Sequence, residues 1–440
     1  MVATAPPSGE EFTTPPVVGE PTLRSGGERR RCTSARDPIG AHAHLWILAG
    51  CIAAQPFSTA AGNIAFGIAV ATSIVRAPHL AEDWLDCLRK PWVLCLLAWV
   101  AWSFLTLLWS PDPGFGIRQY RSLRVLLWIP ILWPYRCRWR FLGAAMVVSA
   151  CALVPVQGAQ VFAGAMRFGH QHVGGGWVHP TQTGVWQATA LVGLVSATAF
   201  GAWRLIALAL PIAAILGFGV VFTASRAAVL SAAAGFGAMT LAPIAARPPL
   251  RTRAFRRVAV LVLVATAVAV GAMQTSPRLV AKFREATTDT GATLATKHDG
   301  ANGESVAEYR LAMWIMGLNA WRSHPIAGWG IGSIPTIAQE TTVSHPRHDM
   351  RKVAMIHSTY LHALVEGGIV GAGLLLCTLV LGARAAWCAM QHDLARAGPA
   401  CAAACWLVAA CFDGYHQSGG LLSIGAIIVP LACGPVRQQA

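Results

Sequence analysis

Long runs of apolar residues alternate with short basic loops along most of the chain. The runs 91–110, 141–164, 205–223 and 258–272 contain no charged residue. They approach the length of about 20 residues that a helix needs to cross the hydrocarbon core of a membrane. A backbone in lipid must satisfy its own hydrogen bonds, so we expect these runs to be helices.

The pattern predicts an all-α polytopic membrane protein with about twelve transmembrane helices. Two of the expected spans, 122–134 and 400–413, are short enough to be tilted or re-entrant. The longest stretch without a span, 274–356, predicts a large, partly helical loop on the outer face. The full set of expected spans is 43–58, 60–76, 92–109, 122–134, 141–164, 181–202, 204–223, 227–246, 258–273, 357–382, 400–413 and 419–433.

These spans divide the chain into five regions. Residues 1–41 are expected to be a disordered basic tail, because they are rich in Pro, Gly, Ser and Thr and lack an apolar period. Residues 42–273 hold the first nine spans, 274–356 the loop domain, 357–433 the last three spans and 434–440 a short tail.

Composition and charge agree with this interpretation. The chain is 55% hydrophobic and 12% charged, and its formal net charge is +15. With both termini inside, most Lys and Arg residues fall in cytoplasmic segments, as the positive-inside rule requires. We therefore expect membrane lipids around the protein and no nucleic-acid partner. Eight of the twelve cysteines lie in expected spans, where Cys is usually a small apolar residue, so we expect no disulfide.

Three polar residues at the outer face are candidates for chemistry. Arg226 separates two apolar spans, Arg310 lies in the loop, and His357 opens the tenth span. A histidine entering the membrane plane can titrate near neutrality and act as a base. The alternatives are that Arg226 snorkels, that Arg310 is a surface residue, and that His357 caps or packs.

The loop segment around Arg310 has its own pattern. Ser305-x-x-Glu308 is typical of a capping box that opens a helix, and Gly328-Trp329-Gly330-Ile331-Gly332 predicts a tight turn after it. The glycines at 367 and 371 allow close helix approach. Between the box and the turn, apolar residues recur at helical spacing: Leu311, Trp314, Ile315, Leu318 and Trp321.

A second group of basic residues lies at the same face. Arg118, Arg121 and Arg124 recur at every third position, and Arg167 lies in another outer loop. Such a row can bind phosphorylated lipid headgroups, although snorkelling explains it equally well. Paired histidines such as His170 and His172 lack a carboxylate or cysteine to complete a ligand set, so we expect no metal site and no cofactor.

These residues together resemble the bacterial O-antigen ligase family, within the group that also contains O-antigen polymerases and O-linked oligosaccharyltransferases. The ligases carry an Arg-x3-Leu element, here Arg226-x3-Leu230. They also carry a His-[Asn/Ser/Gln]-x9-Gly-x2-[Gly/Thr/Tyr] element, here His357-Ser358-x9-Gly368-x2-Gly371. The stretch 310–332 is similar to an Arg-containing helix, Ser-His-Pro and Gly-x-Gly segment of the whole group.

The resemblance implies a reaction and a location. The donor would be a glycan linked to undecaprenyl pyrophosphate, and the acceptor a sugar hydroxyl of lipid A-core, at the periplasmic face of the bacterial inner membrane. The transfer would be inverting and metal-independent, with His357 as base and Arg226 and Arg310 stabilising the pyrophosphate. The fold would resemble the GT-C-like glycosyltransferases that use lipid-phosphosugars.

Other functions stay open. Within the same class, an O-antigen polymerase or a protein O-oligosaccharyltransferase differs only in the acceptor. A secondary transporter or flippase is a different class, but transport usually places charged residues deep within spans, and here the spans are nearly free of charge. A non-catalytic scaffold would leave Arg226, Arg310 and His357 unexplained. The sequence does not indicate an oligomeric state.

The loop charges lead to a test of topology. A reporter that is active only in the periplasm should be active when fused within 285–300 and inactive when fused after Arg256, because basic loops stay inside. The opposite result would place every candidate residue in the cytoplasm.

Overall fold

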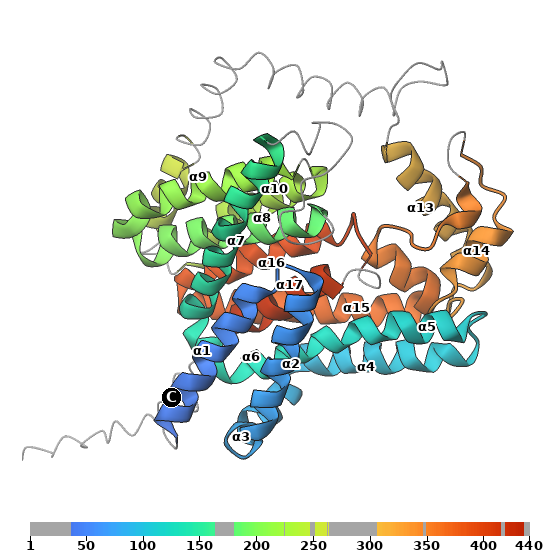
Figure 1. Cartoon of the computed structure of the whole chain (residues 1–440), viewed down its shortest axis with the longest axis horizontal. Helices are drawn as coiled ribbons and strands as arrows, with labels where there is room; N and C mark the ends of the chain where they lie inside the picture. The colour runs from blue at the N-terminus through green and yellow to red at the C-terminus, as the bar shows by residue number, and fades with distance from the viewer. Residues whose placement is uncertain are drawn as a thin grey trace, which may run out of the picture. The chain divides into compact units, whose positions relative to one another are not determined.

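Apolar helices form the described part of the chain (Figure 1). The computed structural model describes residues 37–162, 180–223, 225–246, 251–261, 263, 306–345, 349–414 and 419–434. All of these belong to one of the two compact units into which the chain divides, residues 32–437, and no strand occurs among them. The expected all-α fold is therefore confirmed for these residues. Most of both expected tails, most of the ninth expected span (264–273) and residues 274–305 of the expected loop lie outside them.

The described helices keep the order of the apolar runs. Their bounds are α1 (Pro38–Ala54), α2 (Thr59–Val75), α3 (Ala77–Leu88), α4 (Pro91–Leu105), α5 (Pro113–Tyr120), α6 (Trp128–Leu132), α7 (Trp139–Phe162), α8 (Pro180–Gly201), α9 (Ile206–Phe222), α10 (Arg226–Ala245), α13 (Val306–Ser323), α14 (Ile334–Glu340), α15 (Thr359–His392), α16 (Ala397–Ala409) and α17 (Gly419–Ala432).

Several of these helices have the length and apolar character of membrane spans. Within the described residues, six helical stretches qualify, and a seventh does if α2 and α3, which bend by 103° between them, count as one span. Three more apolar helices are shorter, 38–54, 394–409 and 420–432. The chain is thus a membrane protein, while the count of twelve spans and the GT-C-like resemblance stay predictions. The six stretches are Pro91–Leu108, Pro113–Gln160, Pro180–Gly201, Trp203–Phe222, Arg226–Ala245 and Thr359–His392.

The fourth and fifth expected spans differ from the structure. Instead of two spans at 122–134 and 141–164, the chain forms one helical succession from Pro113 to Gln160. It alternates between α-helix and 3₁₀-helix over 121–138 before α7 begins. Pro130 and Pro134 fall in this part, and each removes a backbone donor that a regular α-helix would use.

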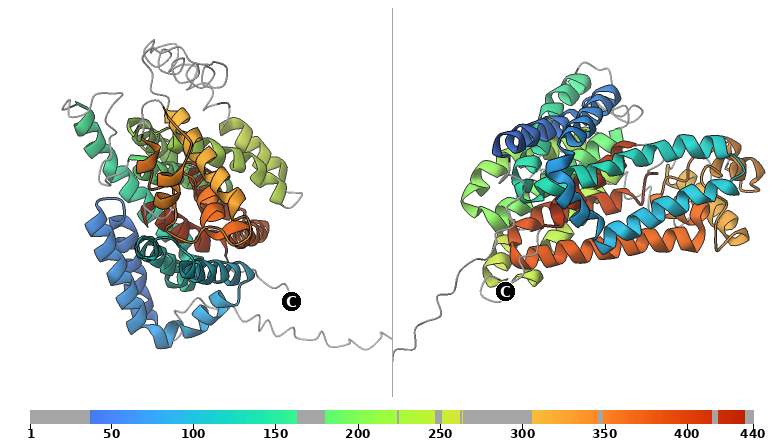
Figure 2. Two further views of the ribbon diagram at one scale, coloured as in Figure 1. Left: turned by 90° about the vertical axis from the view of Figure 1, so that its right-hand side faces the viewer. Right: turned by 90° about the horizontal axis from the view of Figure 1, so that it is seen from below.

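Small residues let the central helices approach closely. α8 packs against α7, α9, α10 and α16, and most of its residues are buried. Gly235 of α10 lies against Cys401 and Cys405 of α16, and Gly193 of α8 lies against Ala402 of α16. Membrane helices commonly associate through such residues, because apolar burial does not drive helices together in lipid. On another side α4 lies along α15 (Figures 1 and 2).

The expectation of no disulfide is wrong at one position. Cys137, near the end of the 3₁₀-helix over 133–138, is disulfide-bonded. The other described cysteines are free.

The helix α15 breaks at Gly368, which has φ 63° and ψ −164°. The break frees backbone donors that the loop segment 325–332, here called the docked loop, then satisfies. The N–H of Ile369 donates to the carbonyl of Pro325 at 2.9 Å, and that of Val370 donates to Ile326 at 3.4 Å. Because buried backbone groups must be paired, the docked loop and the break require each other.

The carbonyls before the break are satisfied from outside the helix as well. The docked loop supplies two of the donors and α4 supplies the third, so the break joins three segments distant in sequence. Val365 accepts from the N–H of Trp329 at 2.9 Å, Glu366 from the N–H of Gly330 at 2.9 Å, and Gly367 from the indole of Trp102 at 2.8 Å.

Polar side chains hold the docked loop on both neighbours. The N–H of Ile331 donates to the hydroxyl of Thr106 at 3.0 Å, and the hydroxyl of Ser110 donates to the carbonyl of Ile331 at 2.8 Å. The buried carboxylate of Glu366 accepts from the N–H of Gly332 at 2.8 Å. The turn expected over 328–332 is therefore confirmed, and its partners are α15 and the segment 106–110 that follows α4.

The docked loop gives a test of this packing. Gly330 has φ 92°, and a Cβ there would lie 2.6 Å from the carbonyl oxygen of Thr106. Gly330→Ala should therefore lower the free energy of unfolding by at least about 1–3 kcal/mol, the usual cost of a strained backbone. The midpoint of thermal unfolding in detergent measures the effect.

The matched control is Gly237→Ala in α10, where an added Cβ meets nothing within 4 Å. Alanine is the better helix former, so this control should unfold at the parent's temperature or above. Equal midpoints for the two variants would contradict the tight docking of the loop.

Candidate active site

His357 occupies a constrained position directly before α15. It is the one residue other than glycine with a positive φ, 51°, among those described. Ser358 follows as the N-cap, and its hydroxyl accepts from the N–H of Leu361 at 3.4 Å. A residue other than glycine in the left-handed conformation costs about 1–3 kcal/mol. Such residues persist only where the surrounding structure holds them, and they cluster at functional sites. The side chain is partly buried, with 27% of its surface exposed.

Asp413 faces this histidine from the segment between α16 and α17. Its Oδ1 lies 3.7 Å from Nδ1 of His357 and accepts from the N–H of Gly414 at 2.9 Å. Its Oδ2 has no hydrogen-bond partner within the part of the chain that the structure describes. Only 6% of the side chain is exposed, and a buried carboxylate needs cations or donors nearby.

The backbone around Asp413 is fastened to the start of α15. The hydroxyl of Thr359 donates to the carbonyl of Asp413 at 2.9 Å. The N–H of Thr359 donates to the carbonyl of Ala410 at 2.8 Å. These bonds fix the two segments that carry the histidine and the carboxylate relative to each other.

Two arginines from other helices belong to the same network of charges. Arg226 is the first residue of α10, after the N-cap Ser225, and Arg310 lies near the start of α13. Burial lowers the pKa of Arg310, the negative charge of Asp413 raises it, and the positive charge of Arg226 lowers it further. Both groups therefore lie within electrostatic range of Arg310, which remains charged because an arginine does not deprotonate in proteins.

The three candidate residues that we expected to do chemistry are thus linked through a fourth. Arg226, Arg310 and His357 come from three separate elements; Asp413 faces His357, and the charges of Asp413 and Arg226 both act on Arg310. We missed Asp413 in the sequence, where it falls at the end of the expected span 400–413. A lone carboxylate at the outer end of a span is the signal that would have found it.

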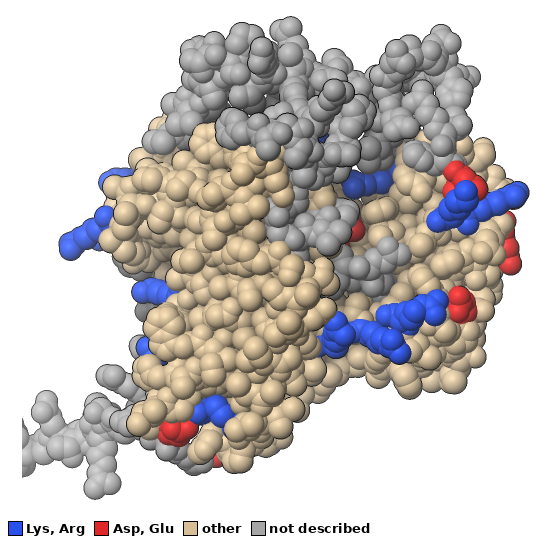
Figure 3. All heavy atoms as spheres, in the orientation of Figure 1, with Lys and Arg blue, Asp and Glu red and all other residues tan. Residues whose placement is uncertain are grey.

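The other expected basic residues form a separate row. Arg118 lies in the last turn of α5, and Arg121 and Arg124 belong to the 3₁₀-helix over 121–127. A 3₁₀-helix has three residues per turn, so the two share one face. All three are exposed, and Figure 3 shows basic side chains in a row over α5.

The described contacts of this row do not join it to the cluster around Asp413. Arg118 lies over the ring of Phe115 at 5.3 Å, and Arg124 donates to the side chain of Asn63 at 2.9 Å. Arg167, the fourth expected binding residue, lies outside the described residues. In the segments that the structure describes, no group of three or more His, Cys, Asp or Glu residues could hold a metal ion.

The cluster suits proton transfer beside an anion. A histidine whose Nδ1 faces a carboxylate leaves Nε2 to accept a proton, and the carboxylate stabilises the imidazolium that forms. Two guanidinium groups close by match the oxygens of a phosphate or pyrophosphate. The arrangement therefore fits attack by a hydroxyl with departure of a phosphorylated group.

Comparison with known protein families places part of the chain in one of them. Residues 211–376 match the family model described as O-antigen ligase. The matched segment includes Arg226, Arg310, the docked loop and His357, whereas Asp413 lies beyond it. A search of the curated proteins finds no match to the chain. The family expected from the sequence motifs is therefore confirmed over this segment.

Proposed function

Because residues 211–376 belong to the O-antigen ligase family, we propose that this membrane protein is an O-antigen ligase. It transfers polysaccharide from undecaprenyl pyrophosphate to a sugar hydroxyl of lipid A-core, at the periplasmic face of the bacterial inner membrane. The observation that supports this most directly is that Asp413 faces His357 and that the charges of Asp413 and Arg226 act on Arg310, since the family match contains three of these four residues.

His357 is the base in this proposal. Its Nε2 takes the proton of the acceptor hydroxyl while that oxygen bonds to the anomeric carbon and the bond from this carbon to the pyrophosphate oxygen breaks. Attack opposite to the leaving group inverts the anomeric configuration. Asp413 holds Nδ1 and stabilises the new positive charge. The 3.7 Å separation is longer than a hydrogen bond, and such contacts commonly tighten when substrate binds.

Arg226 and Arg310 stabilise the leaving group. The departing pyrophosphate gains negative charge, and preorganised cations in a partly buried site lower the energy of that charge. The two guanidinium groups repel each other, as the effect of Arg226 on the pKa of Arg310 shows. An anion between them removes this repulsion, which is a physical reason for donor binding at this point.

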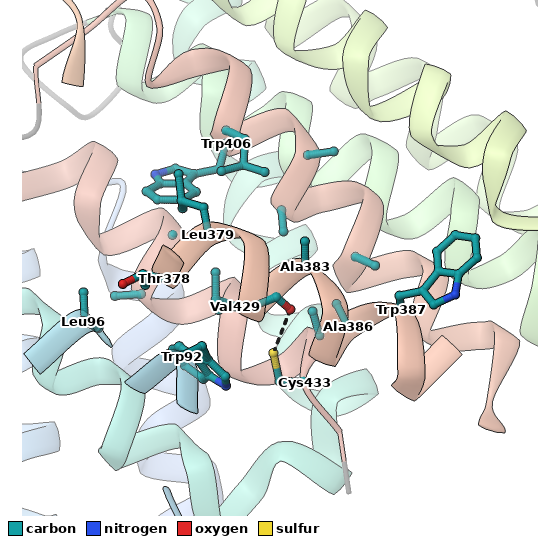
Figure 4. Close-up of a pocket in the computed structure, with 18 of the residues that line it drawn as sticks. Trp92, Leu96, Thr378, Leu379, Ala383, Ala386, Trp387, Trp406, Val429 and Cys433 are labelled. Atoms are coloured by element: carbon teal, nitrogen blue, oxygen red, sulfur yellow. Dashed lines mark hydrogen bonds between the residues drawn. The ribbon is translucent and has the colours of Figure 1, made fainter. Parts of the chain in front are cut away.

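An apolar cavity of about 310 Å³ supports the proposal that the donor is lipid-linked. Its wall is formed by α4, α10, α15, α16, α17 and the 121–132 segment, and it includes Thr359, whose hydroxyl reaches Asp413. Trp92, Leu379 and Trp406 face the cavity from three different helices (Figure 4). A long isoprenoid chain fits such a lining, while its pyrophosphate stays beside the arginines.

The test of this function is a reconstituted transfer. Purified protein with lipid-linked glycan and lipid A-core should produce a ladder of glycosylated lipid A-core on a gel. Chain growth on the lipid-linked glycan would indicate a polymerase instead, and glycan on a protein serine an oligosaccharyltransferase. Glycan movement across proteoliposomes without a new glycosidic bond would indicate a transporter.

Variants separate the roles of the histidine and the carboxylate. His357→Ala should lower the ligation rate by about 100- to 10,000-fold, the usual cost of losing a general base, with donor binding unchanged. Asp413→Asn should lower it less. The double variant should be no slower than His357→Ala alone, because Asp413 acts through the imidazole and the two losses do not add.

The control for the histidine is His324→Ala, which removes an exposed ring that contacts Trp329 at a tilt and should ligate normally. Normal ligation by His357→Ala would show that the base is wrongly assigned. For the arginines, Arg310→Lys should recover little of the activity lost in Arg310→Ala, since lysine lacks the planar fork. Arg322→Lys, exposed on the same helix, is the matched control.

A further inference from the structure

The helix α13 carries apolar side chains on its outward face. Leu311, Ile315 and Leu318, here called the outer row, are 51%, 43% and 40% exposed. Their spacing of four and three residues places them on one face of the helix. The sequence predicts these positions as part of an apolar face, and the structure turns them away from the protein core.

A different face of α13 builds the local core. Ala312, Met313 and Met316 are buried with Ile356 and Val365. An added Cβ at Gly317 would lie 2.9 Å from Ile356, so the helix already packs closely on that side. The outer row is therefore not needed for the packing of α13 on α15. Exposed apolar side chains that form one continuous face indicate a contact with a partner or a membrane.

The apolar surface continues from the docked loop onto a membrane span. Ile326, three residues after α13, is 68% exposed, and Ile369 of α15 is 60% exposed. Backbone hydrogen bonds join the two segments, since Pro325 and Ile326 accept from Ile369 and Val370. Further along α15, Leu376 is equally exposed, within a helix apolar enough to cross the membrane.

Four tryptophans lie around the docked loop and the break of α15. Their indole N–H groups donate to backbone carbonyls. Each ring thus has one polar edge and an apolar remainder, and side chains of this kind are enriched at membrane–water interfaces. The four bonds are Trp102 to Gly367, Trp109 to Gly328, Trp321 to Pro325 and Trp329 to Ala320.

Polar residues end the outer row on the same helix. Arg322 and Asn319 are exposed and bonded to each other at 3.2 Å. An arginine at the end of an apolar face can reach lipid phosphates while its stem stays in the apolar layer. This combination is typical of a helix lying in the interface plane.

We propose that α13 lies in the outer leaflet at the boundary between headgroups and acyl chains, with the outer row in contact with phospholipid. The occupant of this surface is the bilayer itself, because the exposed row continues toward a lipid-facing span and ends in an arginine. The contact fixes the depth of Arg310, which lies on the same helix one residue before Leu311.

Photochemical cross-linking tests this proposal on the full chain in nanodiscs of phosphatidylethanolamine and phosphatidylglycerol. A diazirine-bearing amino acid replaces Ile315 in one variant, Leu376 in a second as the lipid-facing control and Gln339 in a third. Gln339 is an exposed polar position of α14. Mass spectrometry of the cleaved peptides then identifies what each position touches.

Lipid adducts should form at 315 and 376 and be at least tenfold rarer at 339. An adduct between 315 and residues of this same chain, a cross-linked pair of chains, or only the water-quenched product at 315 would each overturn the proposal. The readout does not involve ligation, so its outcome is independent of the proposed reaction.

Discussion

The break of α15 at Gly368 is the constraint on which the outer half of the molecule depends. A broken helix inside a membrane protein leaves donors and acceptors that water cannot reach, and each one left unpaired is costly. The docked loop supplies those partners through Pro325, Ile326, Trp329 and Gly330. It thereby ties the loop region, α4 and α15 together, and it holds α13 where its first turns approach Asp413.

Charge imposes a second constraint in the same region. Asp413 is nearly fully buried, and a buried carboxylate is tolerated only near cations. His357 lies beside Asp413, and the negative charge of Asp413 acts on Arg310. Two arginines and one carboxylate leave the cluster with excess positive charge. In the proposed function the anionic pyrophosphate balances this charge, so that the stability of the cluster and the affinity for the donor would depend on the same residues.

The sequence predicts the helices better than their partners. The helix after Ser305-x-x-Glu308 and the turn at 328–332 follow from local patterns, and both are present. Periodicity does not say which apolar side faces the core, and in α13 Met313 and Met316 are buried while Leu311 is exposed. Likewise, the proximity of Asp413 to His357 arises from bonds between segments about 50 residues apart, such as Thr359 to Asp413, which no short pattern records. Arg226, Arg310 and His357 were found because polar residues at an apolar boundary stand out locally.

In the proposed reaction, the order of environments beside the cluster is itself part of the chemistry. A lipid-linked sugar presents its anomeric carbon at the point where the apolar chain ends and the phosphates begin. The described residues offer the matching sequence of environments: an apolar cavity along α15, then Thr359, then Asp413 with His357 and the arginines. Because the cavity and the cluster share Thr359, the proposed donor would have its lipid chain in the cavity and its phosphates beside the cluster. Under this proposal the fold, rather than contacts to the glycan, orients the donor, and the site would accept glycans of different structure.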